Sequence, residues 1–438
     1  MKKWILCMAV CLVLLLSGCT MQSVDEMYRL PKRSEEFTNL QSVITGVMSG
    51  LEYSAPIAGE NRQTVQTADL DGDGNSEHII FAKGEAEKPL QIFILSNFGG
   101  KFSLLDTIVC NGTAFEQVEY VELNGLPGYE IVVGRQVSNQ VPRSVSVYTL
   151  TGGRLEQLLT TNYAKYLCGD LQGTGLSQLF VLRPGAAEQD NALAELFHFE
   201  NGTVERSAQA SLSAPVDQLM RIIPGKLEGG QNAVFAASAV EQSALVTDVF
   251  AVVDGRFINV NLSTNSATGV ETLRNYYVYG DDIDNDGILE LPTLITMKIS
   301  DDADSSRQQH LIRWYSMKPD GSKVVKRHTY HNYEGGWYME LDSAIAERFT
   351  VIQRGNGFYF YLWDEYGTTT REIMSVYVLT GSKREEQATE ANRFVLYRTE
   401  STVYAARLEV SAAAHGMTKE NVITAFHLIL QDWKTGKT

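Results

Sequence analysis

The sequence predicts a mainly β fold built from five similar units, followed by a smaller module of mixed α and β structure. Three observations support this prediction. A turn rich in acidic residues and glycine recurs five times, an apolar strand follows each copy, and a second turn signal keeps the same phase. A period of about fifty residues that contains several short strands indicates a repeat architecture such as a propeller or solenoid.

The five turns define the boundaries of the units. They begin 48 to 56 residues apart, at Asp69, Glu122, Asp170, Lys226 and Asp282. A tight-turn dipeptide follows in every copy, at Gly99-Gly100, Gly152-Gly153, Asn201-Gly202, Asp254-Gly255 and Asp320-Gly321. These residue pairs supply the positive φ of two-residue hairpins. Each unit therefore reads as four antiparallel strands, which predicts a five-bladed β-propeller over residues 34–334, together with one preceding helix.

The preceding helix is predicted to begin after Ser34. A serine at this position caps a helix, and Glu35 and Glu36 would lie in its first turn, where negative charge is favoured. Apolar residues then recur at helical spacing, at Phe37, Leu40, Ile44, Val47 and Met48. We expect this helix to end at Gly50 and to pack on one face of the propeller.

Residues 335–438 predict a separate α+β domain. A hairpin is expected from strands at 349–354 and 358–363, and further strands are expected at 375–379, 393–398 and 403–410. A terminal helix is expected from Thr418 to Trp433, because apolar residues fall on one helical face. The aromatic strand at 358–363 is interpreted as core, with a sugar-stacking platform as the alternative. Because residues 375–381 resemble the third strand of a unit, a seven-bladed propeller also remains open.

Two of the five turns have the composition of a metal site. Each places four carboxylates within nine residues, a charge density that suits a hard divalent cation. The predicted ligands of the first site are Asp69, Asp71, Asp73, the Asn75 carbonyl and Glu77. Those of the second are Asp282, Asp284, Asp286, the Ile288 carbonyl and Glu290. Oxygen ligands favour Ca²⁺, in a structural role. Solvated acidic turns without metal are the alternative.

This nine-residue pattern carries a family resemblance. Asp-x-Asp-x-Asp-Gly-x-x-Glu before a buried strand resembles the calcium loop of FG-GAP/VCBS-type repeats, the integrin-α-like propellers, over roughly residues 60 to 334. The resemblance implies a calcium-stabilised β-propeller. The last ligand of that family is usually Asp, whereas this chain has Glu77 and Glu290, whose longer side chains should still reach an ion.

The N-terminus predicts export and a membrane anchor. Lys2 and Lys3 precede an apolar stretch at residues 4–16, and Leu16-Ser17-Gly18-Cys19 resembles the lipobox of bacterial lipoproteins. The resemblance implies removal of residues 1–18, acylation of Cys19 and an extracytoplasmic protein anchored to the bacterial membrane by lipid. Residues 19–33 would form the tether. An ordinary secretory signal is the alternative.

Bulk composition limits the partners. The formal net charge is −16, which argues against nucleic acid and against an anionic membrane surface as partners. After the leader and the lipid site are set aside, Cys110 and Cys168 remain, and both are expected to be free thiols.

The predicted function is a non-catalytic binding or scaffold role, with loops presented to a protein, peptide or glycan. The alternatives are a cell-surface glycoside hydrolase or other hydrolase that uses the propeller funnel, and a solute sensor or accessory subunit. No Ser-His-Asp signature, phosphate loop or zinc set is evident. The sequence does not predict an oligomeric state.

Overall fold

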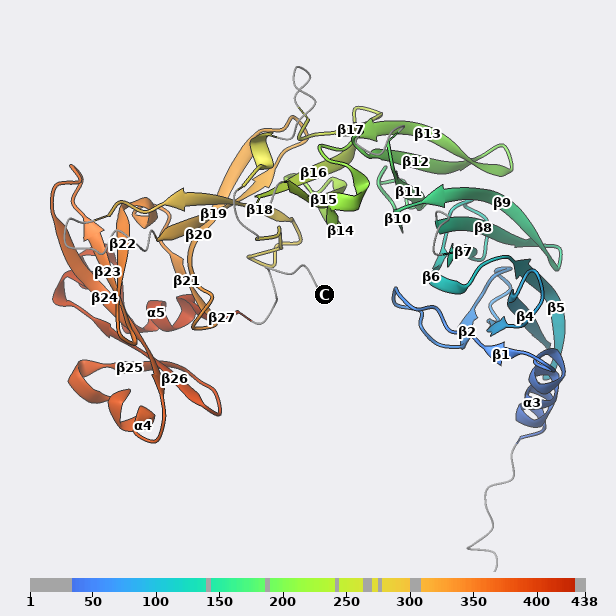
Figure 1. The fold of residues 1–438 in the computed structure, drawn as a ribbon, viewed down its shortest axis with the longest axis horizontal. Coiled ribbons are helices and arrows are strands. Elements are labelled where there is room, and N and C mark those ends of the chain that lie inside the picture. Colours follow the sequence, from blue (N-terminus) through green and yellow to red (C-terminus); the bar gives the residue numbers. More distant parts are fainter. Residues whose placement is uncertain are drawn as a thin grey trace, which may run out of the picture.

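The computed structural model describes residues 34–138, 143–185, 190–240, 244–262, 270–274, 278–299 and 309–429. The predicted leader and tether, with Cys19, lie outside these ranges, as do Leu430 and Trp433 of the expected terminal helix. The described chain is mainly β, as predicted, and forms six antiparallel sheets. Figure 1 shows these sheets following one another along an open arc, from the sheet beside α3 to the sheet beside α5.

The first sheet packs against the predicted helix. Its elements are α3 (Glu35–Val47), β1 (Glu52–Tyr53), β2 (Val65–Ala68), β3 (Glu77–Lys83), β4 (Leu90–Phe98) and β5 (Lys101–Cys110). The Ser34 side chain accepts a hydrogen bond from the Phe37 N–H at 3.1 Å, which confirms the N-cap. Ile44 packs with Ile80 and Phe93 of the sheet, so the helix covers one face of it.

The second, third and fourth sheets repeat one plan, in which four consecutive strands pair in sequence order. The second sheet contains β6 (Ala114–Val121), β7 (Glu130–Gln136), β8 (Arg143–Thr151) and β9 (Arg154–Tyr163). The third contains β10 (Lys165–Gly169), β11 (Gln178–Arg183), β12 (Leu193–Glu200) and β13 (Thr203–Ser211). The fourth contains η1 (Val216–Gln218), β14 (Leu219–Lys226), β15 (Asn232–Val240), β16 (Ala244–Val253) and β17 (Arg256–Asn259). The predicted positions of both turns are confirmed in all three sheets.

The fifth sheet departs from the predicted plan. It comprises η2 (Val270–Thr272), β18 (Glu290–Thr296), β19 (His310–Met317), β20 (Lys323–Asn332), β21 (Trp337–Leu341) and β27 (Phe426–Leu428). Of its expected first strand, the described residues contain only an isolated bridge between Asp281 and Glu290. The predicted boundary at residues 334 and 335 falls in the turn between β20 and β21, which pair with each other.

The expected helix from Thr418 to Trp433 is wrong in length. Thr418 caps a short helix, α5 (Lys419–Ala425), which ends where β27 begins. β27 pairs antiparallel with β21, and Phe426 stacks on Trp337 with ring centroids 5.6 Å apart. Residues 426–428 therefore form a strand on the edge of β21 and not a helix, although their apolar residues have helical spacing, because tertiary pairing and this aromatic contact outweigh the local preference.

The sixth sheet has the strand order β22-β23-β24-β26-β25. Its elements are η3 (Ala346–Arg348), β22 (Phe349–Arg354), β23 (Gly357–Trp363), β24 (Thr370–Thr380), α4 (Arg384–Gln387), η4 (Glu390–Asn392), β25 (Phe394–Arg398), β26 (Thr402–Leu408) and η5 (Val410–His415). The predicted hairpin and later strands are confirmed. Across the described residues the sheets number six and do not close into a ring, so neither five nor seven blades is confirmed.

Aromatic pairs join neighbouring sheets along the arc. Phe81 meets Phe115 at 5.2 Å between the first and second sheets, and Tyr330 meets Phe360 at 5.2 Å between the fifth and sixth. Burying one such side chain contributes about 1.5 to 3 kcal/mol. Phe360 is fully buried, which supports the interpretation of its strand as core. Each sheet thus depends on its neighbour for a complete core.

Cys110 is buried, Cys168 is half-buried, and both are free, as predicted. None of the described helices combines the length and the apolar character needed to cross a membrane.

Candidate metal sites in the acidic loops

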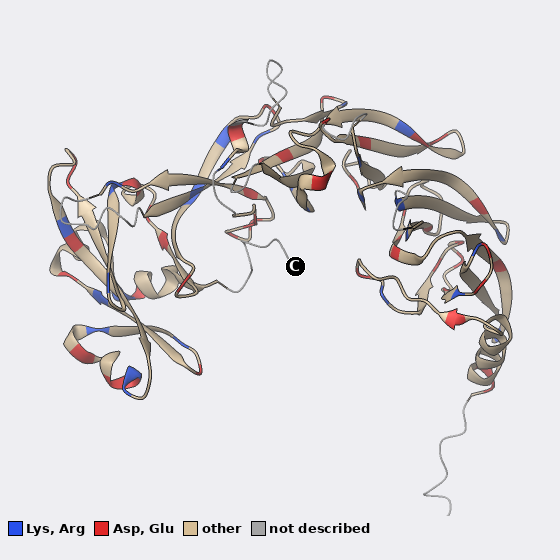
Figure 2. Cartoon of the chain, viewed as in Figure 1, with Lys and Arg blue, Asp and Glu red and all other residues tan. Residues whose placement is uncertain are grey.

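Five loops lead into the second strand position of the first five sheets, all at the same ends of the strands. We call them loops 1 to 5, in chain order, at residues 69–77, 122–130, 170–178, 226–232 and 282–290. Loops 1 and 5 are the two predicted metal sites. Figure 2 shows acidic and basic residues interspersed along the whole arc, so these loops stand out by local density and not by an acidic face.

Loop 1 is shaped by its first carboxylate. Asp69 accepts hydrogen bonds from the backbone N–H groups of Gly72 at 2.8 Å and Gly74 at 3.0 Å. Both glycines have positive φ, +73° and +87°, which the tight turn requires. The folded loop brings carboxylate oxygens of Asp69, Asp71 and Glu77 within 4.8 Å of one another. Three carboxylate oxygens this close form a cluster that could hold a hard cation.

The ninth residue of the loop has the same structural task in four loops. One side-chain oxygen accepts a hydrogen bond from the backbone N–H of the second loop residue, at 2.8 to 3.1 Å. The four pairs are Glu77 with Leu70, Glu130 with Leu123, Gln178 with Leu171, and Glu290 with Ile283. This bond shapes the loop whether or not a cation binds, because it also occurs in loops 2 and 3.

Loops 2 and 5 differ in the hydrogen bonds of the second side-chain oxygen of the ninth residue. In loop 2, Glu130 Oε1 accepts hydrogen bonds from Asn124 Nδ2 at 2.5 Å and from Thr149 Oγ1 at 3.0 Å. In loop 5 the third residue is Asp284 instead of an amide. Asp284 Oδ1 and Glu290 Oε1 are both buried, and neither has a hydrogen-bond donor in the described part of the chain. Buried carboxylate oxygens without donors are costly, and a cation bound by the Asp284 and Glu290 carboxylates would offset this cost.

The carboxylates of loop 5 also come close together. Oxygens of Asp282, Asp284 and Glu290 lie within 4.8 Å of one another, as in loop 1. Burial raises the pKa of Glu290 to about 7, and the neighbouring charges of Asp284, Asp286 and Asp282 act in the same direction. Burial likewise raises the pKa of Glu77. The residues present in both loops therefore fit a divalent cation, which would relieve the mutual repulsion.

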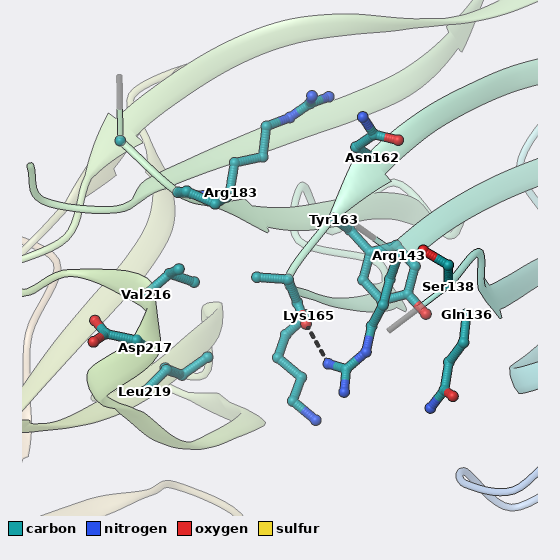
Figure 3. Close-up of a pocket in the computed structure, with 13 residues that line it drawn as sticks. Gln136, Ser138, Arg143, Asn162, Tyr163, Lys165, Arg183, Val216, Asp217 and Leu219 are labelled. Carbon is teal, nitrogen blue, oxygen red and sulfur yellow. Dashed lines mark hydrogen bonds between the residues drawn. The ribbon is translucent and has the colours of Figure 1, made fainter. Parts of the chain in front are cut away.

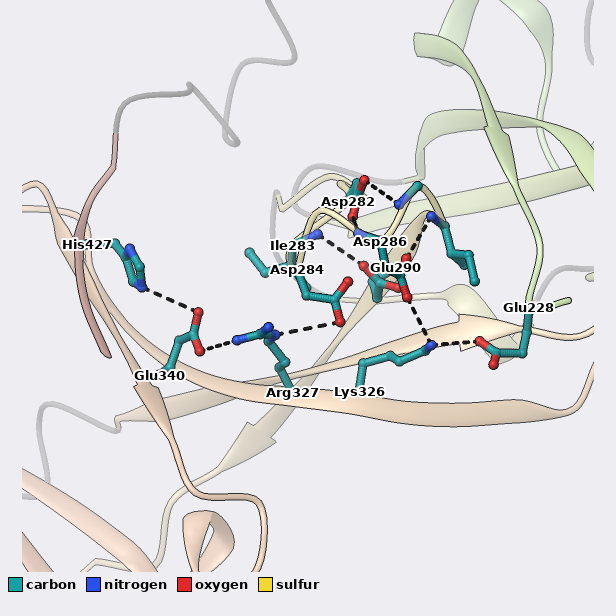
Figure 4. Close-up of polar contacts among 12 residues, drawn as sticks. Glu228, Asp282, Ile283, Asp284, Asp286, Glu290, Lys326, Arg327, Glu340 and His427 are labelled. Atoms are coloured by element: carbon teal, nitrogen blue, oxygen red, sulfur yellow. Dashed lines mark hydrogen bonds and ion pairs between the residues drawn. The ribbon is translucent and has the colours of Figure 1, made fainter. Parts of the chain in front are cut away.

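Basic side chains on β20 approach loop 5 from outside (Figure 4). Lys326 Nζ lies 3.3 Å from Asp286 Oδ2 and 3.0 Å from Glu228 Oε2. Arg327 Nε lies 3.7 Å from Asp284 Oδ2. These cations partly neutralise the negative charge of the loop, and their positive charge would oppose the binding of a metal ion nearby. Sequence reasoning missed them, because no local motif marks strand residues some forty positions away.

The structure places the remaining predicted ligands differently. Asp73 and Asp286 are not part of the two close clusters. Each accepts a hydrogen bond from the backbone N–H two residues further on, that of Asn75 at 2.7 Å and that of Ile288 at 2.8 Å. Asp73 and Asp286 thus stabilise the turn, and their role as ligands, like that of the Asn75 and Ile288 carbonyls, stays a prediction.

The loops also bind one another. The main-chain carbonyl of the first residue in each of loops 1 to 4 accepts a hydrogen bond from the next loop. The pairs are Asp69 with the Tyr129 N–H at 3.0 Å, Glu122 with the Ser177 N–H at 2.8 Å, Asp170 with Asn232 Nδ2 at 2.5 Å, and Lys226 with the Leu289 N–H at 3.1 Å. A cation that holds the shape of loop 1 or loop 5 would therefore also hold contacts between sheets.

Comparisons with known proteins do not assign a family. No family model matches the sequence, and no curated protein matches it. Among solved structures, the chain is similar to the exotype rhamnogalacturonan lyase YesX, with 13% identity, a TM-score of 0.31 and coverage of 74% of this chain and 65% of that one. A rhamnogalacturonan lyase of Bacillus licheniformis is 12% identical, with a TM-score of 0.29 and coverage of 74% of this chain and 72% of that one. A protein from Lactobacillus plantarum is 9% identical, with a TM-score of 0.26 and coverage of 73% of this chain and 85% of that one.

Proposed function

We propose that this chain is an extracytoplasmic bacterial lipoprotein with a non-catalytic binding or scaffold role. Its β-sheet arc would be a propeller of the FG-GAP/VCBS type in which Ca²⁺ stabilises loops 1 and 5. The observation that carries the proposal is the pair of buried oxygens on Asp284 and Glu290, which have no donor among the described residues. All the candidate ligand atoms in the two clusters are carboxylate oxygens, which favours Ca²⁺ over softer metals.

The proposed role of Ca²⁺ is structural. The close oxygens of loop 1 come from Asp69, Asp71 and Glu77, and those of loop 5 from Asp282, Asp284 and Glu290. These residues would bind the ion directly, while the Asp69 and Lys226 carbonyls link the two loops to their neighbours. Because the unfolded chain would not preserve either cluster, binding free energy would become folding free energy.

The proposed location rests on the residues around Cys19. Acylation of its thiol and of the new amino group would supply at least two lipid chains, which anchor a protein stably where one chain does not. The body of the protein would then stand outside the cytoplasmic membrane, where free Ca²⁺ is sufficient for weak sites on the order of 10⁻⁴ to 10⁻³ M.

Thermal unfolding of the full chain, purified in detergent, tests the metal role. Ca²⁺ at roughly a hundredfold excess over its dissociation constant is expected to stabilise the chain by about 2.7 kcal/mol per site, and so to raise the unfolding midpoint by several degrees. Asp71→Asn and Asp284→Asn should each remove part of this shift. Asp170→Asn is the matched control, because Asp170 holds backbone N–H groups of loop 3, at 2.7 and 3.0 Å. An identical shift in all variants would contradict the proposal.

A further inference from the structure

A cleft of about 870 Å³ opens among the second, third and fourth sheets (Figure 3). It lies at the strand ends opposite to loops 1 to 5. Loop 2 joins the end of β6 to the start of β7, whereas the cleft is bordered by the end of β7 and the start of β8. The side chains that matter for its chemistry are Gln136, Arg143, Lys165, Arg183, Asp217 and Leu219.

Two of the three basic residues in the cleft already have acidic partners. Arg143 Nε lies 2.8 Å from Glu116 Oε2, and its Nη1 donates to the Ala164 carbonyl at 3.1 Å. Arg183 forms an ion pair with Glu195, and in Figure 3 its guanidinium points away from Lys165. The positive charges of both arginines are therefore largely compensated within the protein.

Lys165 is different. It is exposed at the start of β10, and no acidic residue or hydrogen-bond acceptor of the described chain pairs with its ammonium group. In Figure 3 its side chain extends in the same direction as those of Arg143 and Gln136. The side chain of Gln136 likewise has no hydrogen-bond partner among these residues. A charged donor, the outer edge of a guanidinium and a free amide thus share one wall.

The opposite wall of the cleft contains one acidic and one apolar side chain. Asp217 of η1 and Leu219 of β14 line the cleft across from Lys165. An exposed carboxylate there can accept hydrogen bonds from hydroxyl groups, and it disfavours a ligand with several negative charges. Among the described residues, one cation without an acidic partner thus faces one exposed carboxylate, and this arrangement suits a ligand with a single negative charge and hydroxyl groups.

We propose that this cleft binds a small hydroxylated monocarboxylate, the chemical class of the sugar acids. Lys165 and Arg143 hold the carboxylate through charge-assisted hydrogen bonds, and Gln136 and Asp217 bind the hydroxyl groups. The inference deepens the binding role proposed above and rests on it. It is independent of the metal, because the cleft and the acidic loops lie at opposite ends of the strands.

Isothermal titration of the full chain in detergent with D-glucuronate tests the proposal, with glucose and inorganic phosphate as comparison ligands. The wild type should bind glucuronate and should not bind glucose. It should bind phosphate more weakly than glucuronate. Lys165→Met should weaken glucuronate binding by about tenfold or more, because one charge-assisted hydrogen bond is lost. Lys101→Met is the matched control and should bind like the wild type, because Lys101 is an exposed lysine of the first sheet.

Three results would overturn the proposal: no glucuronate binding by the wild type, equal binding by Lys165→Met, or tighter binding of phosphate. The Ca²⁺-induced shift of the unfolding midpoint is measured on the same samples. If this shift persists while glucuronate fails to bind, the cleft assignment is wrong and the metal role stands. If glucuronate binds while the shift is missing, the cleft assignment is supported and the metal role is wrong.

Discussion

Glu290 accepts a hydrogen bond from the Ile283 N–H at 3.1 Å with one carboxylate oxygen, while its other oxygen is buried without a donor in the described chain. Its counterpart in loop 2, Glu130, makes the same kind of backbone contact, but its second oxygen is bound by Asn124 and Thr149. The two loops share this backbone contact, but the second carboxylate oxygen has side-chain donors in loop 2 and none in the described chain in loop 5. This difference is the physical basis for expecting a cation in loop 5.

Removal of a competing cation should strengthen metal binding at loop 5. Lys326→Met deletes an ammonium group 3.3 Å from Asp286 Oδ2. Even in a water-like dielectric, one such charge contributes about 1 kcal/mol of repulsion toward a nearby cation, so Ca²⁺ affinity should rise by about fivefold or more. Lys323→Met is the control on the same strand, since Lys323 pairs with Glu271 and not with the loop. Weaker Ca²⁺ binding by Lys326→Met, followed calorimetrically, would refute the competition.

Contact between loops 1 and 2 predicts unequal effects for two equivalent glycines. Gly72 and Gly173 both occupy the fourth loop position, with φ of +73° and +71°. A Cβ on Gly72 would lie 2.3 Å from Pro127 Cβ, whereas nothing lies within 4 Å of one on Gly173. Gly173→Ala should cost about 1 to 2 kcal/mol of left-handed strain, and Gly72→Ala clearly more. Equal urea midpoints for the two variants would show that the loops do not pack this closely.

The buried imidazole of His331 predicts an acid-dependent stability. Burial lowers its pKa to about 3, and the ring stacks on Tyr338 at 5.1 Å. In the unfolded chain the group takes up a proton near pH 6.5, so its contribution to stability is present above that pH and is lost as the pH falls toward 3. His331→Gln should make the pH dependence of the unfolding free energy shallower by about 1.4 kcal/mol per unit in this window. An unchanged slope in denaturant titrations would contradict the assignment.

Lipid attachment at Cys19 predicts a change of location. Cys19→Ala removes the thiol that would be acylated, so the variant should fail to incorporate labelled palmitate and should lose its stable association with membranes. Fractionation of cells that express the wild type and the variant measures both properties. Palmitate incorporation that survives the substitution would show that a residue other than Cys19 is acylated, and a wild type that incorporates no palmitate would point to an ordinary secretory signal.

Local features of the fold were predictable from the sequence. Asn201 and Asp254 adopt positive φ, 53° and 49°, at the hairpin turns where their pairing with glycine indicated it. Ser34 caps its helix as expected. These features depend on a few neighbouring residues, so composition and spacing suffice to locate them.

Features that depend on distant parts of the chain were not predictable. β27 forms because the edge of β21, about ninety residues earlier, is available for pairing, and nothing local distinguishes Phe426 from a helical residue. The cleft combines Arg143 and Lys165 from different sheets, and no motif connects them. The number of sheets and the open arc likewise follow from packing between units and not from the repeat itself.

Direct measurement of Ca²⁺ binding tests the central claim most sharply. Calorimetric titration of the full chain, freed of metal by chelator, is expected to show about two sites per chain with dissociation constants on the order of 10⁻⁴ to 10⁻³ M. Asp71→Asn and Asp284→Asn should each abolish one site, and the double variant both. If the wild type takes up no Ca²⁺, or if the double variant binds as the wild type does, the acidic loops are not metal sites.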